Sequence, residues 1–263
     1  MNRSIQWVFF VLFVSVVTST TAQQPFAVYL QPSSINVPAT HSGAFADWNG
    51  KWIFIGGRID GLHIMQAMQA FPTYGRNDSI YIVDPVSNTH TSLDATLLQP
   101  DIYQAVTSSN MEFYQDGKYL YMIGGYGKMS AQNSWITFPS IVSVDLDCLE
   151  LAAASGTSPG ACFRQIIDTN MAVAGGMLEK IDSTYYLTFG HRFDGLYAAV
   201  AMGGMFTQQY TNEIRRFSIQ DDGVNLSISN YSALQDTTVY HRRDLNLVPQ
   251  IYPSGDYGFT AFG

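Results

Sequence analysis

One short pattern recurs along this chain: a turn with Asp or Asn, usually beside Gly, then an apolar strand that ends in glycine. The copies span residues 49–57, 116–125, 182–191 and 255–263. Their final glycines follow one another at intervals of roughly 70 residues, which indicates a repeat architecture. Asn-Gly or Asp-Gly between alternating apolar runs is also the strongest short-range signal for a β-hairpin. The chain is therefore expected to consist of repeated antiparallel units.

Each repeat is expected to hold four short strands, without helical periodicity. The first two strands form the hairpin, whose first arm is residues 43–46 in the first copy and residues 111–114 in the second. The third and fourth strands are predicted at residues 80–84 and 89–93, 141–145 and 163–167, and 214–217 and 226–229. Four short antiparallel strands per repeat is the content of one propeller blade.

Two motifs resemble the kelch family of β-propellers. The family's double glycine after the second strand stands at Gly56-Gly57 and Gly124-Gly125, and residues 77–90 follow its third-strand pattern. The third copy departs from the family with Gly190-His191, and His90 stands where the family usually has Trp, in a packing role. The resemblance implies an all-β, kelch-like β-propeller over residues 38–263, with blades at about 38–105, 106–171 and 172–238 and a partial blade at 239–263. A different propeller family is the alternative.

The fourth copy stops in mid-motif at Gly263. Propellers close with typically four to eight blades, so we expect an N-terminal fragment of a six- to eight-bladed propeller. Three blades alone would leave large apolar faces exposed. If Gly263 is a natural end, the blades would have to close by oligomerising or by pairing with another chain.

The first 22 residues have the features of a secretory signal peptide. Arg3 gives the positive start, residues 5–17 are almost wholly apolar, and small residues precede Gln23. The run is shorter than the roughly 20 apolar residues of a membrane span. We expect cleavage after Ala22, a lead-in over residues 23–37, and a secreted, periplasmic or cell-surface protein with no membrane span after cleavage. An uncleaved anchor is the alternative.

Export makes the two cysteines interpretable. Cys148 and Cys162 flank a stretch that is expected to be a loop between two strands. In an oxidising compartment they would form a disulfide, which would contribute roughly 3 kcal/mol in the chain-entropy model. Two free thiols with a catalytic role are the alternative.

Composition and motifs exclude several classes of protein. The formal net charge of −8 argues against a basic face for nucleic acid. A hydrophobic content of 46% excludes a disordered chain, and two cysteines exclude a Cys-based zinc cluster. The sequence has no P-loop, no Gly-x-Ser-x-Gly elbow and no His-Glu-x-x-His. No cofactor, metal site or catalytic residue is therefore predicted.

The pattern Arg-apolar-Asp-Gly-Leu occurs at residues 58–62 and again at 192–196. Both copies follow a second strand, where the loops of a propeller commonly bind ligands. Arg can clamp a carboxylate or sulfate, and Asp can accept from sugar hydroxyls or help to bind calcium. The competing interpretation is that each Arg pairs with its own Asp. The candidate ligand-binding residues are Arg58, Asp60, His63, Trp135, His191, Arg192, Asp194 and Arg242.

The leading function is a secreted, non-catalytic scaffold that binds an unidentified protein or a glycan. Aromatic faces stack on sugar rings, and Trp135, in the expected long loop of the second blade, is the strongest such candidate. The alternative is a carbohydrate-active enzyme, which the resemblance implies as a sialic-acid mutarotase-like or a copper-dependent, galactose-oxidase-like propeller. Three triplets beginning at Asn77, Asn225 and Asn230 also match the N-glycosylation sequon.

Overall fold

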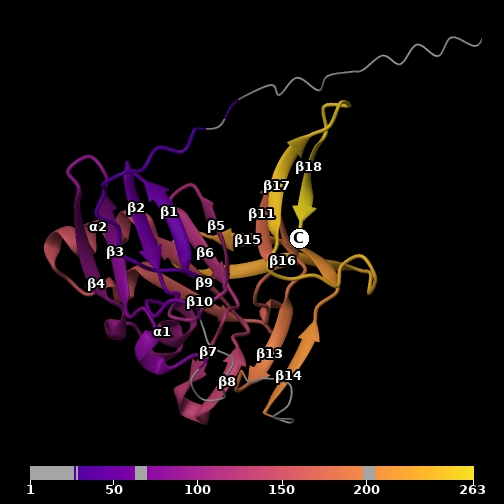
Figure 1. Cartoon of the computed structure of the whole chain (residues 1–263), viewed down its shortest axis with the longest axis horizontal. Coiled ribbons are helices and arrows are strands. Elements are labelled where there is room, and N and C mark those ends of the chain that lie inside the picture. Colours follow the sequence, from indigo (N-terminus) through magenta and orange to yellow (C-terminus); the bar gives the residue numbers. More distant parts are fainter. Residues whose placement is uncertain (1–26, 28, 63–69, 198–204) are drawn as a thin grey trace, which may run out of the picture. The chain divides into compact units, whose positions relative to one another are not determined.

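A computed structural model describes residue 27 and residues 29–62, 70–197 and 205–263 (Figure 1). The contacts divide the chain into residues 1–34 and residues 35–263, and the described helices and strands all belong to the second unit. The predicted signal peptide, residues 1–22, lies outside the described residues. A search of the described residues found no helix long and apolar enough to cross a membrane.

Three four-stranded antiparallel sheets follow one another along the chain. The first contains β1 (Ala44–Trp48), β2 (Lys51–Ile55), β3 (Ser79–Asp84) and β4 (Thr89–Asp94) in that order. The second contains β5 (Glu112–Asp116), β6 (Tyr119–Ile123), β9 (Ser140–Asp145) and β10 (Phe163–Ile167). The third contains β11 (Met177–Ile181), β12 (Thr184–Thr188), β15 (Glu213–Asp221) and β16 (Leu226–Gln235). The predicted all-β class and the four strands per repeat are confirmed, whereas closure into a propeller stays a prediction.

Three separate hairpins accompany these sheets. β7 (Tyr126–Met129) pairs with β8 (Ser134–Thr137), and β13 (His191–Gly195) pairs with β14 (Phe206–Tyr210). Each of these hairpins is inserted between the second and third strands of its sheet, where the sequence analysis predicted only a long loop. β17 (Asn246–Ile251) and β18 (Tyr257–Phe262) form the third hairpin, which is the start of the fourth repeat.

The described helices are few and short. The α-helices are α1 (Pro100–Val106) and α2 (Leu146–Ser155), and the 3₁₀ turns are η1 (Thr73–Gly75), η2 (Ala95–Leu97), η3 (Ser130–Gln132), η4 (Pro159–Cys162) and η5 (Thr169–Met171).

The expectation of a loop between the two cysteines is wrong. Asp145 caps α2 by accepting from the backbone N–H of Cys148, and Gly156 ends the helix in the left-handed conformation. Leu146, Leu149 and Ala152 are buried, at a spacing that helical periodicity would have predicted. The predicted disulfide is confirmed, since it ties this helix to the residue before β10 with a Cα–Cα distance of 5.4 Å.

The middle sheet is buried on both faces because its side chains alternate between two cores. In β6, Leu120 and Met122 belong to a core shared with the first sheet, whereas Tyr121 and Ile123 belong to a core shared with the third. Successive strand residues point to opposite faces of a sheet. An uninterrupted apolar strand such as β6 is therefore the sequence pattern of a sheet with neighbours on both sides.

Four residues in the left-handed conformation link the repeats through their backbones. Asn110 donates to the carbonyl of Ser42, Gly175 to that of Asn110, and Asp244 to that of Gly175, at 2.9, 3.1 and 2.7 Å. All four have φ between 53° and 69°, a region that Gly, Asn and Asp enter more readily than other residues. We call these four residues the inter-repeat ladder.

The double glycine allows the same close approach between neighbouring repeats. A Cβ on Gly56 would lie 2.0 Å from the carbonyl oxygen of Val106, and one on Gly124 would lie 2.0 Å from that of Val173. The following glycines, Gly57 and Gly125, donate to backbone carbonyls of the next repeat at 2.9 and 2.8 Å. The double glycine is thus a point where two backbones touch.

The third repeat is shifted by one residue from the predicted alignment. Gly190 donates to the backbone carbonyl of Arg242, which makes it the equivalent of Gly57 and Gly125. Phe189, with φ of 58°, takes the position of the first glycine. The alignment of Gly190-His191 with the double glycines of the first two copies is therefore wrong by one residue.

We expect Gly124→Ala to destabilise the protein by about 2 kcal/mol more than Gly117→Ala, as measured by urea unfolding. Both glycines have positive φ, but a Cβ on Gly117 would meet nothing within 4 Å. The control therefore carries the conformational cost alone. Equal losses in the two variants would show that the backbone contact with Val173 is unimportant.

Glu112, on the first strand of the middle sheet, generates a prediction about pH. Its side chain is buried at 4% exposure and accepts from the backbone N–H of Gly176 at 2.8 Å. Burial raises the pKa of this carboxyl from 4.5 to about 8. The folded protein therefore holds the proton more tightly than the unfolded chain, so stability falls as pH rises from about 4.5 to about 8.

We expect Glu112→Gln to remove this pH dependence, because glutamine can still accept from Gly176 but carries no charge. Urea unfolding should show the variant more stable by on the order of 3 kcal/mol at pH 8 and nearly unchanged at pH 4. A difference that is the same at both pH values would contradict a buried, neutral carboxyl.

Candidate functional site

The hairpins β7–β8 and β13–β14 lie side by side and are joined by one threonine. The hydroxyl of Thr137 on β8 donates to the backbone carbonyl of Phe193 on β13 at 2.8 Å, and accepts from the backbone N–H of the same residue at 2.8 Å. The backbone N–H of Thr137 also donates to Asp194 at 3.1 Å. The two insertions therefore form one surface, although they are far apart in the sequence.

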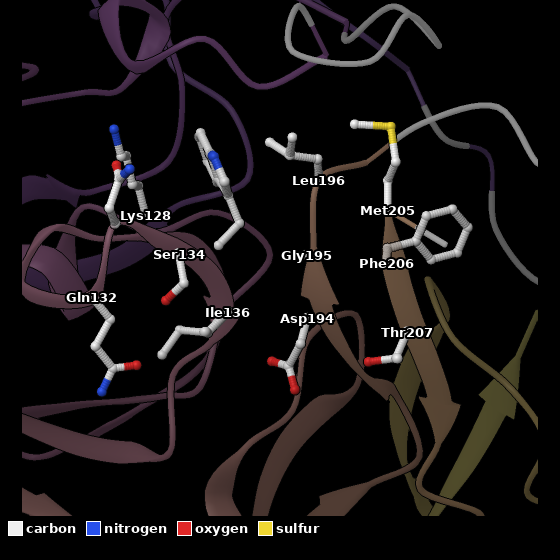
Figure 2. Close-up of a pocket in the computed structure, with 12 residues that line it drawn as sticks. Lys128, Gln132, Ser134, Ile136, Asp194, Gly195, Leu196, Met205, Phe206 and Thr207 are labelled. Carbon is white, nitrogen blue, oxygen red and sulfur yellow. The ribbon is translucent and has the colours of Figure 1, made fainter. Parts of the chain in front are cut away.

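A pocket of about 740 Å³ lies between these hairpins. Figure 2 shows Lys128, Ser134 and Ile136 on one side of it, and Asp194, Met205 and Thr207 on the other. A second pocket of about 260 Å³ adjoins it and is lined by the segment of residues 70–74. Trp135, Lys128 and Leu196 line both pockets, so these three side chains separate them.

Trp135 is held rigidly as an aromatic wall. It stacks on Tyr126 with ring centroids 5.6 Å apart and an angle of 26° between the planes. Tyr126 in turn meets Phe71 and Phe193 edge-on, at 5.2 and 5.3 Å, and its hydroxyl donates to the carbonyl of Gly195 at 2.7 Å. The structure places Trp135 on strand β8 and half-buried, rather than in an exposed loop.

Polar groups with unused hydrogen-bonding capacity surround this wall. The hydroxyl of Ser134 is buried without a hydrogen-bond partner among the described residues. Lys128 stands directly opposite Trp135 in the β7–β8 register, and the described residues give its ammonium group no acidic partner. Buried polar groups are normally satisfied, so the Ser134 hydroxyl is an unusual unpaired group, but its oxygen is too buried to meet a bound molecule as it stands.

Asp194 contributes the carboxylate of this pocket. Arg192 donates to it at 2.6 Å, and the backbone of Thr137 donates to its other oxygen. Lone pairs remain on both oxygens, because an ionised carboxylate accepts up to about four hydrogen bonds. Arg192 itself is exposed and makes this ion pair with its own Asp, as the competing interpretation of the repeated motif expected.

Arg58 and Asp60 form the corresponding pair in the first repeat. Arg58 is buried, donates twice to Asp60 at 2.8 and 2.5 Å, and donates to the carbonyl of Pro72 at 2.9 Å. Hydrogen bonding from Arg58 lowers the pKa of Asp60. The guanidinium also lies over the ring of Phe71 at 5.2 Å. This arginine therefore anchors the residue 70–74 segment that lines the second pocket.

The two copies of the arginine motif do not occupy equivalent positions. The isolated bridges His41–Arg58, Ser109–Tyr126 and Ala174–His191 make Arg58, Tyr126 and His191 equivalent. Arg192 is therefore one residue further along the extended chain, and a shift of one residue places a side chain on the opposite face. Arg58 is accordingly buried and Arg192 exposed.

His191 is buried at 6% exposure, and burial is the main reason that its pKa is lowered to about 4. Its Nδ1 lies 2.7 Å from the side-chain nitrogen of Gln208. It lines a smaller pocket of about 120 Å³ with Arg243 and Asp244. The imidazole is therefore neutral near pH 7 and cannot supply a positive charge to a ligand.

Another candidate, Arg242, does not line the large pocket. Arg242 donates to the carbonyls of Val239, at 2.9 Å, and Gly263. His63 lies outside the described residues. His90 is exposed and meets the ring of Tyr81 edge-on, with centroids 5.9 Å apart, so it packs on the sheet surface.

The ligand-binding candidates predicted from the sequence do not include Lys128, Ser134 or Thr207. Lys128 and Ser134 become neighbours of Trp135 only through the β7–β8 hairpin, whose turn contains Asn133 in the left-handed conformation. Asparagine enters this conformation more readily than most residues, so Asn133 was a local signal for this turn.

The described residues contain no group of three or more His, Cys, Asp or Glu side chains placed to hold a metal ion. The two cysteines are bonded to each other.

No protein-family model matches the chain, and no curated protein sequence matches it. A similar solved structure is titled "Structure of YjhT"; it has a TM-score of 0.36 and 9% identity, over 84% of this chain and 80% of that one. At this TM-score a common fold is not shown, and the function is inferred from the pocket itself.

Replacing Thr137 by Val tests whether this residue holds the two hairpins together. We expect a loss of about 1–3 kcal/mol in urea unfolding, because the buried N–H and carbonyl of Phe193 would lose their side-chain partner. Thr207→Val is the matched control, since Thr207 is exposed at the pocket and its hydroxyl makes no hydrogen bond within the described part of the chain. Equal losses would show that the hairpins are held by other contacts.

Proposed function

We propose that this chain is a secreted, kelch-like propeller protein that acts as a non-catalytic binding module, and that it binds a carbohydrate between β7–β8 and β13–β14. The repeated four-stranded sheets support the family assignment, and so do the double glycines at which neighbouring repeats come into backbone contact. The observation that carries the function is Trp135, a half-buried indole stacked on Tyr126 that lines a pocket of about 740 Å³ together with Lys128 and Asp194.

Carbohydrates fit this combination of groups. A pyranose ring has an apolar face of C–H groups, which an indole covers, and a rim of hydroxyl groups, which need donors and acceptors. Lys128 offers a donor on one side of the pocket and Asp194 an acceptor on the other (Figure 2). The ammonium group of Lys128 adds a positive charge without an acidic partner among the described residues, which favours an acidic saccharide over a neutral one.

The same pocket favours binding over glycoside hydrolysis. Glycosidases generally use two carboxyl groups that flank the scissile bond. Among the described residues that line the large pocket, Asp194 is the single carboxylate, and Arg192 already neutralises its charge. The enzyme alternative, such as a mutarotase-like activity, therefore has less support from this geometry than binding has.

Titration of the whole protein with a panel of neutral and acidic monosaccharides and oligosaccharides tests this function. We expect calorimetry to detect binding, and Trp135→Ala to weaken it about tenfold, since an aromatic contact contributes roughly 1.5 kcal/mol. Trp135→Phe should lose less, because it keeps an aromatic face.

Phe45→Ala is the matched control, because Phe45 is an exposed aromatic residue of the first sheet that lines neither pocket. It should leave affinity unchanged. If the wild-type protein binds no saccharide in the panel, or if Trp135→Ala binds as tightly as wild type, the proposed site is wrong. Interconversion of saccharide anomers by the wild-type protein would favour the enzyme alternative.

A further inference from the structure

The three N-glycosylation sequons differ sharply in their surroundings. Asn77 is buried at 1% exposure, and both ends of its amide are used. Its Nδ2 donates to the backbone carbonyl of Gly56 at 3.0 Å, and its Oδ1 accepts from the backbone N–H of Ser79 at 3.0 Å. A glycan on this nitrogen would have no space, because the nitrogen is buried against the backbone of Gly56.

The other two asparagines are exposed and lie on one hairpin. Asn225 is in the turn between β15 and β16, where its Nδ2 lies 3.0 Å from a carboxylate oxygen of Asp222 at the surface. Asn230 is within β16 and is exposed, with φ of 55°. In the strand register, Arg216 pairs with Ser232 and Ser218 pairs with Ser229. Two residues of β16, one of them Asn230, therefore lie opposite a single residue of β15 and form a β-bulge. The bulge takes Asn230 out of the regular strand pairing.

The strand that carries Asn230 is the outer strand of its sheet. β16 follows β15 at the end of the sheet order, and the described residues give it no second strand partner. From Asn230 to Gln235, all residues except Ser232 are exposed, among them Tyr231 at 38% and Leu234 at 49%. An exposed edge strand with apolar side chains is prone to pair with another chain unless something covers it.

We propose that Asn225 and Asn230 carry N-linked glycans when the chain passes through a eukaryotic secretory pathway, that Asn77 stays unmodified, and that the glycan on Asn230 shields the edge of β16. The proposal depends on export directed by residues 1–22, and it is independent of the saccharide-binding pocket. The sequons supply Ser227 and Ser232 as the hydroxyl residues that the transferase requires.

The modification is a glycosyl transfer from a lipid-linked oligosaccharyl diphosphate. The side-chain Nδ2 forms a bond to the anomeric carbon of the oligosaccharide, and the bond from that carbon to the diphosphate oxygen breaks. The lipid diphosphate leaves with the electron pair of that bond, and one amide proton passes to a base of the transferase. No oxidant or reductant is required.

Expression of the full chain in a eukaryotic cell line tests the assignment. We expect the intact mass to fall by two glycans on treatment with peptide N-glycosidase, which converts each modified Asn to Asp. Asn225→Gln and Asn230→Gln should each lose one glycan, and the double variant should lose both. Ser227→Ala and Ser232→Ala remove the same sequons while keeping the asparagines, so they should match the Gln variants.

Several results would overturn the assignment. A chain with fewer than two glycans, whether in the medium or retained in the cell, would contradict it, as would a glycan found on Asn77. The shielding role has its own test, in which light scattering compares secreted Asn230→Gln with Asn225→Gln. Asn230→Gln should self-associate at lower concentration, and equal association of the two variants would exclude shielding by the glycan on Asn230.

Discussion

Backbone contact between neighbouring repeats is the constraint on which the rest of this structure depends. The inter-repeat ladder joins Ser42, Asn110, Gly175 and Asp244 through successive N–H to carbonyl hydrogen bonds. All four residues have left-handed conformations. At a second point of backbone contact there is no room for a side chain, because a Cβ on Gly56 or Gly124 would collide with a carbonyl of the next repeat.

The buried cores follow from this close approach. Because adjacent sheets meet at the ladder, the strands of the middle sheet bury both faces, with Leu120 in one core and Tyr121 in the other. The same arrangement brings the insertion of the second repeat against that of the third. Thr137 and Phe193 then bond across 56 residues of chain and hold together the two hairpins that line the candidate pocket.

The candidate site could be predicted only in part. The sequence singled out Trp135 and Asp194, which do line one pocket, but it also grouped Arg58 with Arg192, which the structure places on opposite sides of the strand. The error came from one residue: Phe189 adopts a conformation that sequence reasoning reserves for glycine, so the third repeat was aligned one position too late. A match between motifs cannot reveal such a shift, because only the strand register fixes the face that each side chain occupies.

The sequence by itself determined the all-β class, the four-stranded repeats, the hairpin turns and the disulfide, because these depend on local periodicity, turn chemistry and pairing of two cysteines that are close in the chain. It did not determine helix α2, the inserted hairpins or the pocket between them. Those depend on contacts between distant residues, such as Thr137 with Phe193, and on burial, which left Asn77 inaccessible and Asn230 exposed. Tertiary structure alone decides these features, because identical local sequence patterns meet different neighbours once the repeats are packed together.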